Sequence, residues 1–176
     1  MRAFLAIEVS DEARREIVNV IEVLKKSGLF TGKFVEPPHL HVTLKFFGDI
    51  LEKEAGMIHE VLRTLEFPTF SCSLGKLGLF ADRILWIDLE DHGSLKKMHG
   101  IIDEKLGDFF GREERFHNHI TLARIKHLPD PEKLRVFLKQ MVIQPVSFTV
   151  KEYLLKKSVL LPSGPEYEDV FTYDLV

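Results

Sequence analysis

An approximate internal repeat limits the fold of this chain more than any other feature of its sequence. The order strand–helix–strand–helix–strand occurs twice, in residues 1–78 and again in residues 82–157. The predicted helices carry apolar residues with a helical period, whereas the second strand of each copy alternates apolar and polar residues. The predicted helices cover residues 11–26, 52–65, 95–109 and 131–139, and the predicted strands cover residues 3–9, 39–47, 69–77, 84–89, 116–125, 146–156 and 168–174.

Local signals mark the ends of several of these elements. Ser10, Ser94 and Asp130 are predicted N-cap residues, because their side chains can accept a backbone N–H from the first helical turn. The triplet Ser163-Gly164-Pro165 predicts the turn between the last two strands.

Together these elements predict an α+β protein with one bilobal domain over residues 1–176. The alternating polar positions of the second strands indicate a sheet with one exposed face, which antiparallel sheets allow. We therefore expect two pseudo-symmetric lobes, each a mainly antiparallel sheet backed by helices, with a central groove.

Composition narrows the class of partner. The formal net charge is −3, whereas proteins that coat long stretches of nucleic acid are usually basic. Any contact with RNA should therefore be made through a local pocket. The single cysteine, Cys72, excludes an internal disulfide and a cysteine metal cluster. No signal peptide or membrane-spanning run is recognisable, so we expect a cytoplasmic monomer that does not bind membranes.

Each half carries the same short motif in its second strand. The motifs are His41-Val42-Thr43-Leu44 and His119-Ile120-Thr121-Leu122. In a strand, residues i and i+2 point to the same face, so each histidine shares a face with its threonine. If a pseudo-two-fold axis relates the lobes, the two His–Thr pairs meet across the groove.

Two facing histidines can carry phosphoryl transfer by general acid–base catalysis. Imidazole has an ordinary pKa of about 6.5, so that one ring can take a proton while the other gives one. We predict that His41 protonates the leaving oxygen and that His119 activates water, although the near-equivalent motifs leave the opposite order of roles open. The hydroxyls of Thr43 and Thr121 are predicted to hold the non-bridging phosphate oxygens. This scheme needs no metal and no cofactor.

Further polar residues near the motifs are candidates for phosphate contacts. Strand alternation predicts Lys45 on the face of His41. Arg124 follows His119 by five residues, so a regular strand turns it away, and a β-bulge is needed to bring it into the groove. Additional groove candidates are Arg115, Lys156 and Ser158.

Two other functions remain compatible with these residues. His39 and His117 each precede a motif histidine by two positions, and an HxH pair on a strand can bind zinc, as in a metal-dependent phosphodiesterase. Against this alternative, no obvious Asp or Glu ligand recurs at matched positions of the halves. A non-catalytic protein that binds RNA ends would keep the same groove. The other histidines are expected at the surface: His59, His92, His99 and His127.

The paired motifs resemble those of the two-histidine (2H) phosphoesterase superfamily, and the chain is most similar to its RNA 2′,3′-cyclic phosphodiesterase or 2′-5′ RNA ligase branch. A tryptophan often precedes the first motif in this family, and here Phe34 is the ring in that segment. The resemblance covers nearly the whole chain. The segments that carry it are Arg2-Ala3-Phe4-Leu5-Ala6-Ile7, the run from Pro38 to Gly48, the run from His119 to Arg124, and the tail Tyr153-Leu154-Leu155-Lys156-Lys157-Ser158 with Gly164 and Tyr167.

The resemblance implies hydrolysis of a 2′,3′-cyclic phosphate to a 2′-phosphate, with no cofactor. It also implies a reverse activity that joins RNA ends through a 2′-5′ linkage without ATP. It assigns His41 and His119 as the catalytic pair and favours Arg124 as a substrate contact. The expected partners are RNA ends or nucleotides that carry a 2′,3′-cyclic phosphate, tRNA fragments among them.

Overall fold

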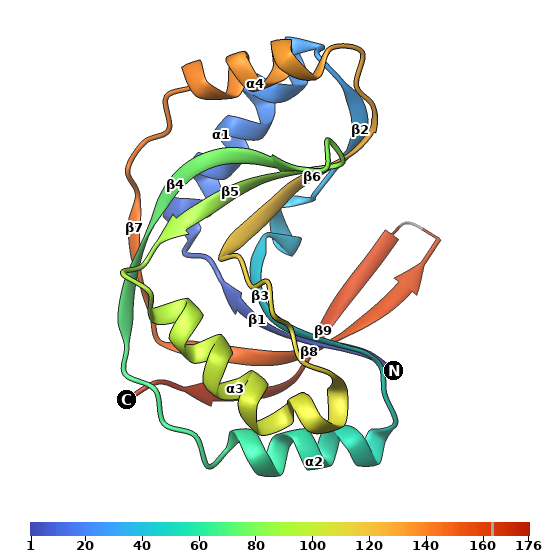
Figure 1. Cartoon of the computed structure of the whole chain (residues 1–176), viewed down its shortest axis with the longest axis vertical. Helices are drawn as coiled ribbons and strands as arrows, with labels where there is room; N and C mark the ends of the chain where they lie inside the picture. The colour runs from blue at the N-terminus through green and yellow to red at the C-terminus, as the bar shows by residue number, and fades with distance from the viewer. Residues whose placement is uncertain (163) are drawn as a thin grey trace.

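The computed structural model describes residues 1–162 and 164–176, and within them it contains one nine-stranded sheet and four α-helices (Figure 1). All strand pairings in this part of the chain are antiparallel, so the predicted α+β class, with an antiparallel sheet backed by helices, is confirmed. The helices are α1 (Asp11–Ser27), α2 (Glu52–Leu62), α3 (Ser94–Phe110) and α4 (Pro131–Gln140), with a short 3-10 helix at Pro37–His39. The strands are β1 (Arg2–Glu8), β2 (Thr31–Phe34), β3 (His41–Asp49), β4 (Phe70–Phe80), β5 (Ile84–Glu90), β6 (His119–His127), β7 (Ser147–Val150), β8 (Glu152–Leu161) and β9 (Gly164–Asp174).

Capping side chains set the beginnings of the helices. Ser10 and Asp130 each accept a backbone N–H from the first turn of α1 and α4, as predicted. The prediction for Ser94 is wrong, because Gly93 is the N-cap of α3 and the carboxylate of Asp91 accepts a first-turn N–H instead. Among the described residues, no helix is both long and apolar enough to cross a membrane.

The sheet contains one strand that the sequence pattern did not reveal. The strand β2 has only four residues and pairs with β6. The predicted strand over residues 146–156 is instead divided between β7 and β8, which are separated at Lys151. The predicted turn at Ser163-Gly164-Pro165 includes Ser163, which lies outside the described residues; Gly164 is the first residue of β9.

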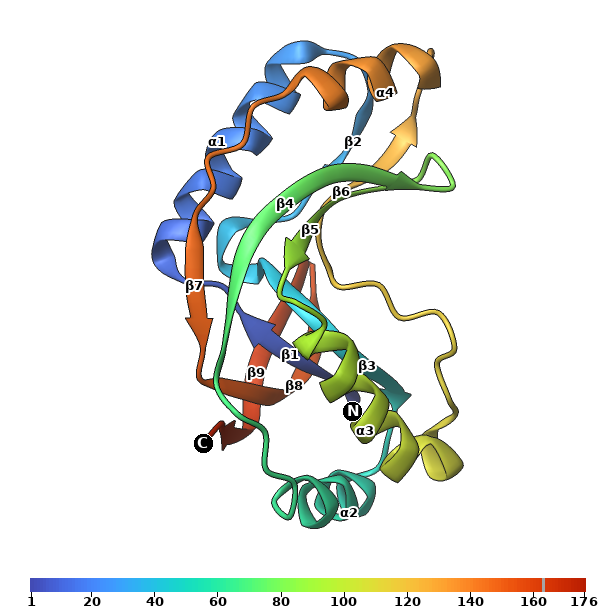
Figure 2. The ribbon, with the colours of Figure 1, turned by 60° about the vertical axis from the view of Figure 1, so that its left-hand side comes forward.

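The strand order shows that both halves of the sequence contribute to each lobe. The sheet runs β7-β4-β5-β6-β3-β1-β8-β9, with β2 attached to β6. One lobe contains β3, β1, β8 and β9 with α2 and α3, and the other contains the remaining strands with α1 and α4 (Figures 1 and 2). Thus β4 of the first half pairs with β5 of the second, and β8 of the second half pairs with β1 of the first.

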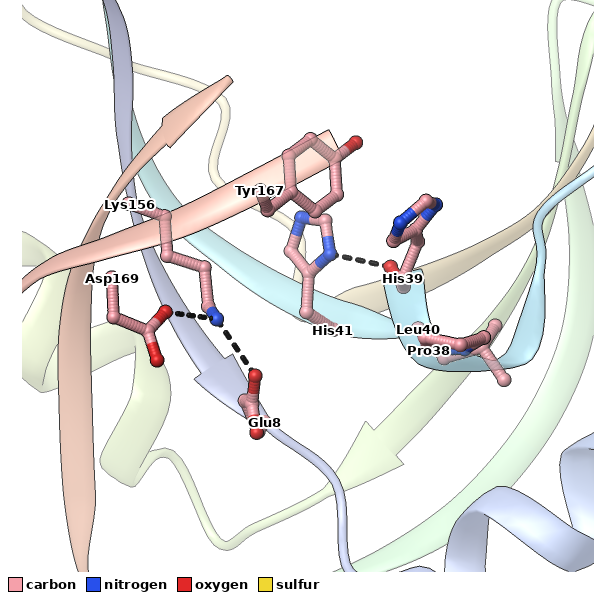
Figure 3. A pocket seen from close by; sticks show the side chains of 8 residues that line it. All are labelled: Glu8, Pro38, His39, Leu40, His41, Lys156, Tyr167 and Asp169. Atoms are coloured by element: carbon pink, nitrogen blue, oxygen red, sulfur yellow. Dashed lines mark hydrogen bonds and ion pairs between the residues drawn. The ribbon is translucent and has the colours of Figure 1, made fainter. Parts of the chain in front are cut away.

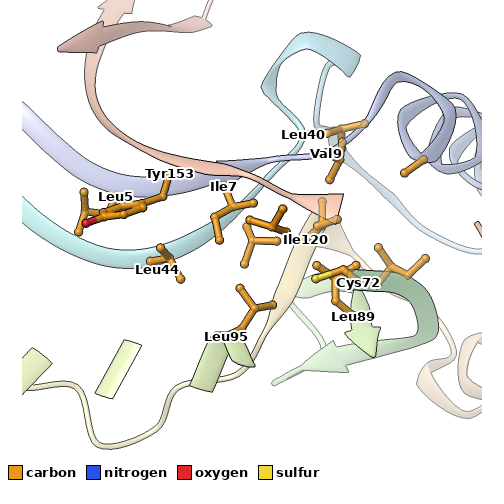
Figure 4. Close-up of a cluster of buried hydrophobic side chains, with 14 of the residues drawn as sticks. Leu5, Ile7, Val9, Leu40, Leu44, Cys72, Leu89, Leu95, Ile120 and Tyr153 are labelled. Carbon is orange, nitrogen blue, oxygen red and sulfur yellow. The ribbon is translucent and has the colours of Figure 1, made fainter. Parts of the chain in front are cut away.

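One apolar core runs through both lobes. Val42 of β3 pairs with Ile120 of β6 where the lobes meet, and both side chains are fully buried. Leu5, Ile7 and Leu95 belong to the same cluster of buried side chains (Figure 4). Burying one large aliphatic side chain contributes roughly 1.5–3 kcal/mol relative to leaving it exposed. The core therefore favours the strand register that brings the two HxTL motifs together.

Candidate active site

The two HxTL motifs lie side by side on paired strands. Their second residues, Val42 and Ile120, pair in antiparallel register, so each motif histidine lies across from the threonine of the other motif. We call the sheet face opposite Val42 and Ile120 the histidine face; it carries the half-buried side chains of His41, Thr43, His119 and Thr121.

A β-bulge interrupts the alternation in both motif strands. The register between β1 and β3 shifts by one residue at Leu44, and that between β5 and β6 shifts by one residue at Leu122. Two consecutive residues then point to the core, and the residues that follow exchange faces. As a result Lys45 turns inward, whereas Phe46 and Arg124 turn to the histidine face.

The prediction that Lys45 shares the face of His41 is therefore wrong. Lys45 is 2% exposed, and its Nζ donates hydrogen bonds to Asp103 Oδ1 (2.5 Å) and to the carbonyl oxygen of Gly111 (2.7 Å). Burial raises the pKa of Asp103, whereas the hydrogen bonds from Lys45 and from a backbone N–H lower it. Together these hydrogen bonds outweigh burial, so the pKa of Asp103 lies below its ordinary value. Lys45 thus ties α3 to β3 beneath the site.

The bulge in β6 has the opposite effect on Arg124, which it brings to the histidine face in an exposed position. The charge of Arg124 acts on Tyr167 of β9. Burial raises the pKa of Tyr167, and the positive charges of Arg124 and Arg2 partly oppose this rise. These two arginines give this end of the histidine face a positive character that suits a phosphate.

Both motif histidines are held in the same tautomer by a backbone carbonyl. The Nδ1 of His41 lies 2.7 Å from the carbonyl oxygen of His39, and the Nδ1 of His119 lies 2.7 Å from that of His117. A carbonyl oxygen can only accept, so Nδ1 carries the proton in each ring. The neutral ring therefore has its lone pair on Nε2, which in His41 lies 3.1 Å from Thr43 Oγ1.

Burial makes both rings harder to protonate. It lowers the pKa of His41 to about 4; the carbonyl of His39 opposes this change, and the positive charge of Lys156 adds to it. Burial also lowers the pKa of His119, again against the effect of its carbonyl partner. Both rings are therefore neutral at neutral pH, and a nearby phosphate anion would raise both pKa values.

Aromatic rings account for much of this burial. Phe80 and Trp86 flank His119 as Phe4 and Tyr167 flank His41. Gly78 makes room for the indole, because a Cβ at this position would clash with the ring of Trp86. The ring-centroid separations are 5.1 Å for Phe4–His41, 5.5 Å for Tyr167–His41, 5.0 Å for Phe80–His119 and 6.4 Å for Trp86–His119.

A carboxylate also lies opposite each motif histidine on the neighbouring strand. Glu8 of β1 pairs with His41, and Asp88 of β5 pairs with His119. Acidic residues therefore do recur at matched positions of the two halves. Both carboxylates are engaged, Glu8 by the ammonium group of Lys156 and Asp88 by a backbone N–H of β4. Within the described residues, no group of three or more His, Cys, Asp or Glu side chains could hold a metal ion.

The other groove candidates have different environments. Lys156 is 5% exposed and lies beside the first motif, and Ser158 is half-buried on the same strand. Arg115 is exposed in the segment between α3 and β6. Phe34 packs against Phe30, with ring centroids 5.4 Å apart, on the inward side of β2, so it does not line the histidine face.

The histidines outside the motifs differ from the surface positions predicted for them in two cases. His99 is 4% exposed, and its Nδ1 lies 2.7 Å from the carbonyl oxygen of the bulged Leu44. His59 is half-buried. His92 and His127 are exposed, as predicted.

A pocket of about 220 Å³ opens beside His41 (Figure 3). We call it the His41 pocket. On one side, Lys156 Nζ donates to Glu8 Oε1 (2.7 Å) and to Asp169 Oδ1 (2.6 Å). Burial lowers the pKa of Lys156, but these hydrogen bonds outweigh burial, so that its pKa lies above its ordinary value. The lining residues are Glu8, Pro38, His39, Leu40, His41, Lys156, Tyr167 and Asp169.

The sequence and the fold both match known proteins. An RNA 2′,3′-cyclic phosphodiesterase from Archaeoglobus fulgidus is 32% identical, and the match covers 99% of this chain and 100% of that protein. A protein of the same name from Thermotoga maritima is 32% identical, with 97% and 94% covered. The crystal structure of TT0787 from Thermus thermophilus has a TM-score of 0.77 at 28% identity, with 99% and 98% covered.

E. coli LigT in its apo form shares the fold, with a TM-score of 0.80 at 22% identity and with 99% of this chain and 96% of LigT covered. The model of the 2′-5′ RNA ligase superfamily matches residues 9–157, a range that contains both HxTL motifs. The family resemblance predicted from the two motifs is confirmed, and this chain belongs to the 2′-5′ RNA ligase superfamily.

Proposed function

We propose that this protein hydrolyses 2′,3′-cyclic phosphate ends of RNA to 2′-phosphate ends, with His41 and His119 as its acid–base pair and without a metal ion. The observation that carries the proposal is the shared tautomer of the two histidines. Because a carbonyl holds each Nδ1–H, Nε2 is left for proton transfer in both rings. One neutral ring can accept a proton at Nε2, and the other can donate from Nε2 once it is protonated, which a bound phosphate anion favours.

The relatives support the substrate class. Those from Archaeoglobus fulgidus and Thermotoga maritima are named RNA 2′,3′-cyclic phosphodiesterases and match nearly the whole chain. LigT, which shares the fold, has been crystallised with the nucleotide 3′-AMP. We therefore take RNA ends and nucleotides with a 2′,3′-cyclic phosphate, including tRNA fragments, as the substrates.

The polar residues of the histidine face each have a role in the proposed reaction. His119 accepts a proton from water, whose oxygen attacks phosphorus, while the bond from phosphorus to the ribose 3′-oxygen breaks. His41 donates a proton to that oxygen, and the product keeps the phosphate on its 2′-oxygen. Thr43 and Thr121 donate hydrogen bonds to the non-bridging oxygens, and Arg124 adds positive charge where negative charge grows.

The same groups would catalyse formation of a 2′-5′ linkage. An RNA 5′-hydroxyl in place of water would attack the cyclic phosphate, and the 3′-oxygen would leave as before. No ATP is needed, because the phosphodiester that opens is replaced by another phosphodiester.

The test is turnover of an RNA oligomer with a 2′,3′-cyclic phosphate end, measured in the presence of EDTA. His41→Ala and His119→Ala should each reduce kcat by at least about 10²-fold, because a positioned acid or base contributes roughly 10²–10⁴-fold. His127→Ala is the matched control, since His127 is exposed at the end of the strand that begins with His119. It should keep wild-type turnover.

Two results would contradict the proposal. If EDTA abolishes wild-type turnover and zinc or manganese restores it, the histidines act as metal ligands. If the wild-type protein binds the RNA end but opens no ring under any of these conditions, it is a binding protein.

A further inference from the structure

The His41 pocket adjoins only one of the two motif histidines, and this asymmetry bears on how a substrate lies in the site. The pocket is lined by His41, whereas His119 is not among its lining residues. If the phosphate binds between the two histidines, whatever fills this pocket is attached to the phosphate on the His41 side. The inference below therefore rests on the proposed function.

The charged groups of the pocket favour a neutral ligand with N–H donors. The buried ammonium group of Lys156 uses one oxygen of Glu8 and one oxygen of Asp169. The second oxygen of each carboxylate has no hydrogen-bond partner in the described part of the chain, and the two side chains are 46% and 52% exposed. Among the charged lining residues, two carboxylates stand against one ammonium, and their second oxygens can accept N–H groups. The positive charges of Arg124 and Arg2 act on Tyr167 from outside the lining.

Aromatic side chains form another wall of the pocket. The rings of His39 and Tyr167 have centroids 4.9 Å apart, and Tyr167 covers His41 edge-on (Figure 3). Proteins that hold unpaired bases stack them on such rings and read their edges with hydrogen bonds. Pro38 and Leu40 add apolar surface to this wall.

We propose that the His41 pocket holds the terminal base of the substrate and that Glu8 and Asp169 select bases that carry an exocyclic amino group. Cytosine presents an amino group where uracil presents a carbonyl oxygen. An amino group can donate to the carboxylates, whereas a carbonyl oxygen is repelled by them. Purines with an amino group are accepted for the same reason.

This placement also orients the reaction. In phosphoryl transfer the attacking and leaving oxygens lie roughly in line through phosphorus. A base in the His41 pocket brings its own ribose to the His41 side of the phosphate. The leaving 3′-oxygen then lies at His41 and the attacking water at His119, which is the order of roles in the proposed mechanism.

The experiment compares two matched substrates that differ only in the terminal base. RNA oligomers ending in cytidine or uridine 2′,3′-cyclic phosphate are assayed for kcat/KM, and 3′-CMP and 3′-UMP are assayed for binding by calorimetry. Wild type should prefer cytidine by at least about fivefold in both measurements, as expected for one well-placed base contact.

Glu8→Gln and Asp169→Asn provide the variants, because an amide can donate to the uracil carbonyl oxygen. Both should reduce or reverse the cytidine preference. Since the ratio compares two substrates on the same variant, an altered His41 affects both rates and cancels. Glu168→Gln is the control: Glu168 precedes Asp169 on β9, is 60% exposed and pairs with Lys157 outside the pocket. It should keep the wild-type ratio.

Equal binding of the two nucleotides, or a preference that neither pocket variant changes, would overturn the base-selection proposal. Turnover of both oligomers at equal rates would do the same and would leave the proposed hydrolysis standing. A cytidine preference in binding with no turnover of either oligomer would support the pocket and contradict the hydrolysis.

Discussion

At the scale of single residues, the backbone two positions before each motif histidine determines its chemistry. The carbonyls of His39 and His117 hold Nδ1–H of His41 and His119, whichever side chain stands at those two positions. The contact that sets the tautomer thus comes from the main chain at these positions and not from the first histidine of each HxH pair. Either histidine can exchange a proton only at Nε2, and burial favours the neutral ring in both.

These lowered pKa values predict an acidic optimum for kcat/KM. The rate rises with pH as the base loses its proton and falls as the acid loses its proton, and kcat/KM reports the free protein. Burial lowers the pKa of His41 to about 4 and lowers that of His119 below its ordinary value, so both limbs lie on the acid side. We expect the maximum below about pH 6.5. The kcat profile should lie at higher pH, because bound phosphate raises both pKa values.

Profiles of the residual activity of the variants separate the two roles. His119→Ala should lose the acid limb, because the base has been removed, and His41→Ala should lose the alkaline limb. The opposite pattern would exchange donor and acceptor. A kcat/KM maximum above about pH 7.5 in the wild type would contradict the lowered pKa values themselves.

At the scale of secondary-structure elements, equivalent bulges in β3 and β6 place different residues in equivalent positions. The shift at Leu44 buries Lys45 and exposes Phe46, and the corresponding shift at Leu122 exposes Arg124. One bulge thus provides an internal ion pair, and the other provides a cation on the histidine face. Removing Lys45 should therefore affect mainly stability, and removing Arg124 should affect mainly activity.

Lys45→Ala should destabilise the fold without a specific loss of activity. It leaves the carboxylate of Asp103 without its cation beneath the sheet, and breaking a buried pair in this way costs about 3–5 kcal/mol. Arg124→Ala should change the free energy of unfolding by less than about 0.5 kcal/mol. It should nevertheless lower kcat/KM about tenfold or more, as expected for loss of a charged hydrogen bond to phosphate. Urea unfolding and steady-state kinetics measure the two effects.

A stable Lys45→Ala variant with tenfold lower kcat/KM would instead place this ammonium group at the substrate. That result would favour regular alternation in β3 over the bulge.

Features that depend on residues close in sequence could be predicted from the sequence, whereas features that depend on the pairing of distant strands could not. The caps of α1 and α4 and the face shared by His41 and Thr43 depend on residues close in sequence, so local patterns predicted them. The position of Lys45 depends on the extra residue of β3, Leu44, which has no partner in β1. The two strands are separated in sequence by α1, β2 and the 3-10 helix. The strand β2 was missed because its four residues pair only with the distant β6.

At the scale of the whole molecule, the two halves of the sequence are interleaved. Strand β8 completes the lobe that begins with β1, and β4 completes the lobe built on β5. The order of elements in each half was visible in the sequence. The exchange of strands and helices between the lobes was not visible, because it does not change that order. For the same reason the matched carboxylates, Glu8 and Asp88, could be recognised only after the strands were paired.

Interleaving predicts that neither half folds alone. A fragment of residues 1–80 has β1 without β8 and β4 without β5, so both of its part-sheets lack a neighbour that covers their backbone groups and completes their core. The fragment of residues 81–176 lacks the complementary strands. We expect each fragment alone to show no cooperative unfolding transition, and the mixture to regain both the transition and the turnover. The control is the whole chain, nicked after folding in the turn of residues 81–83, which should remain folded and active because its strands stay paired. Cooperative unfolding of residues 1–80 alone would mean that the first half is an independent lobe, and the pairing of β1 with β8 would then be dispensable.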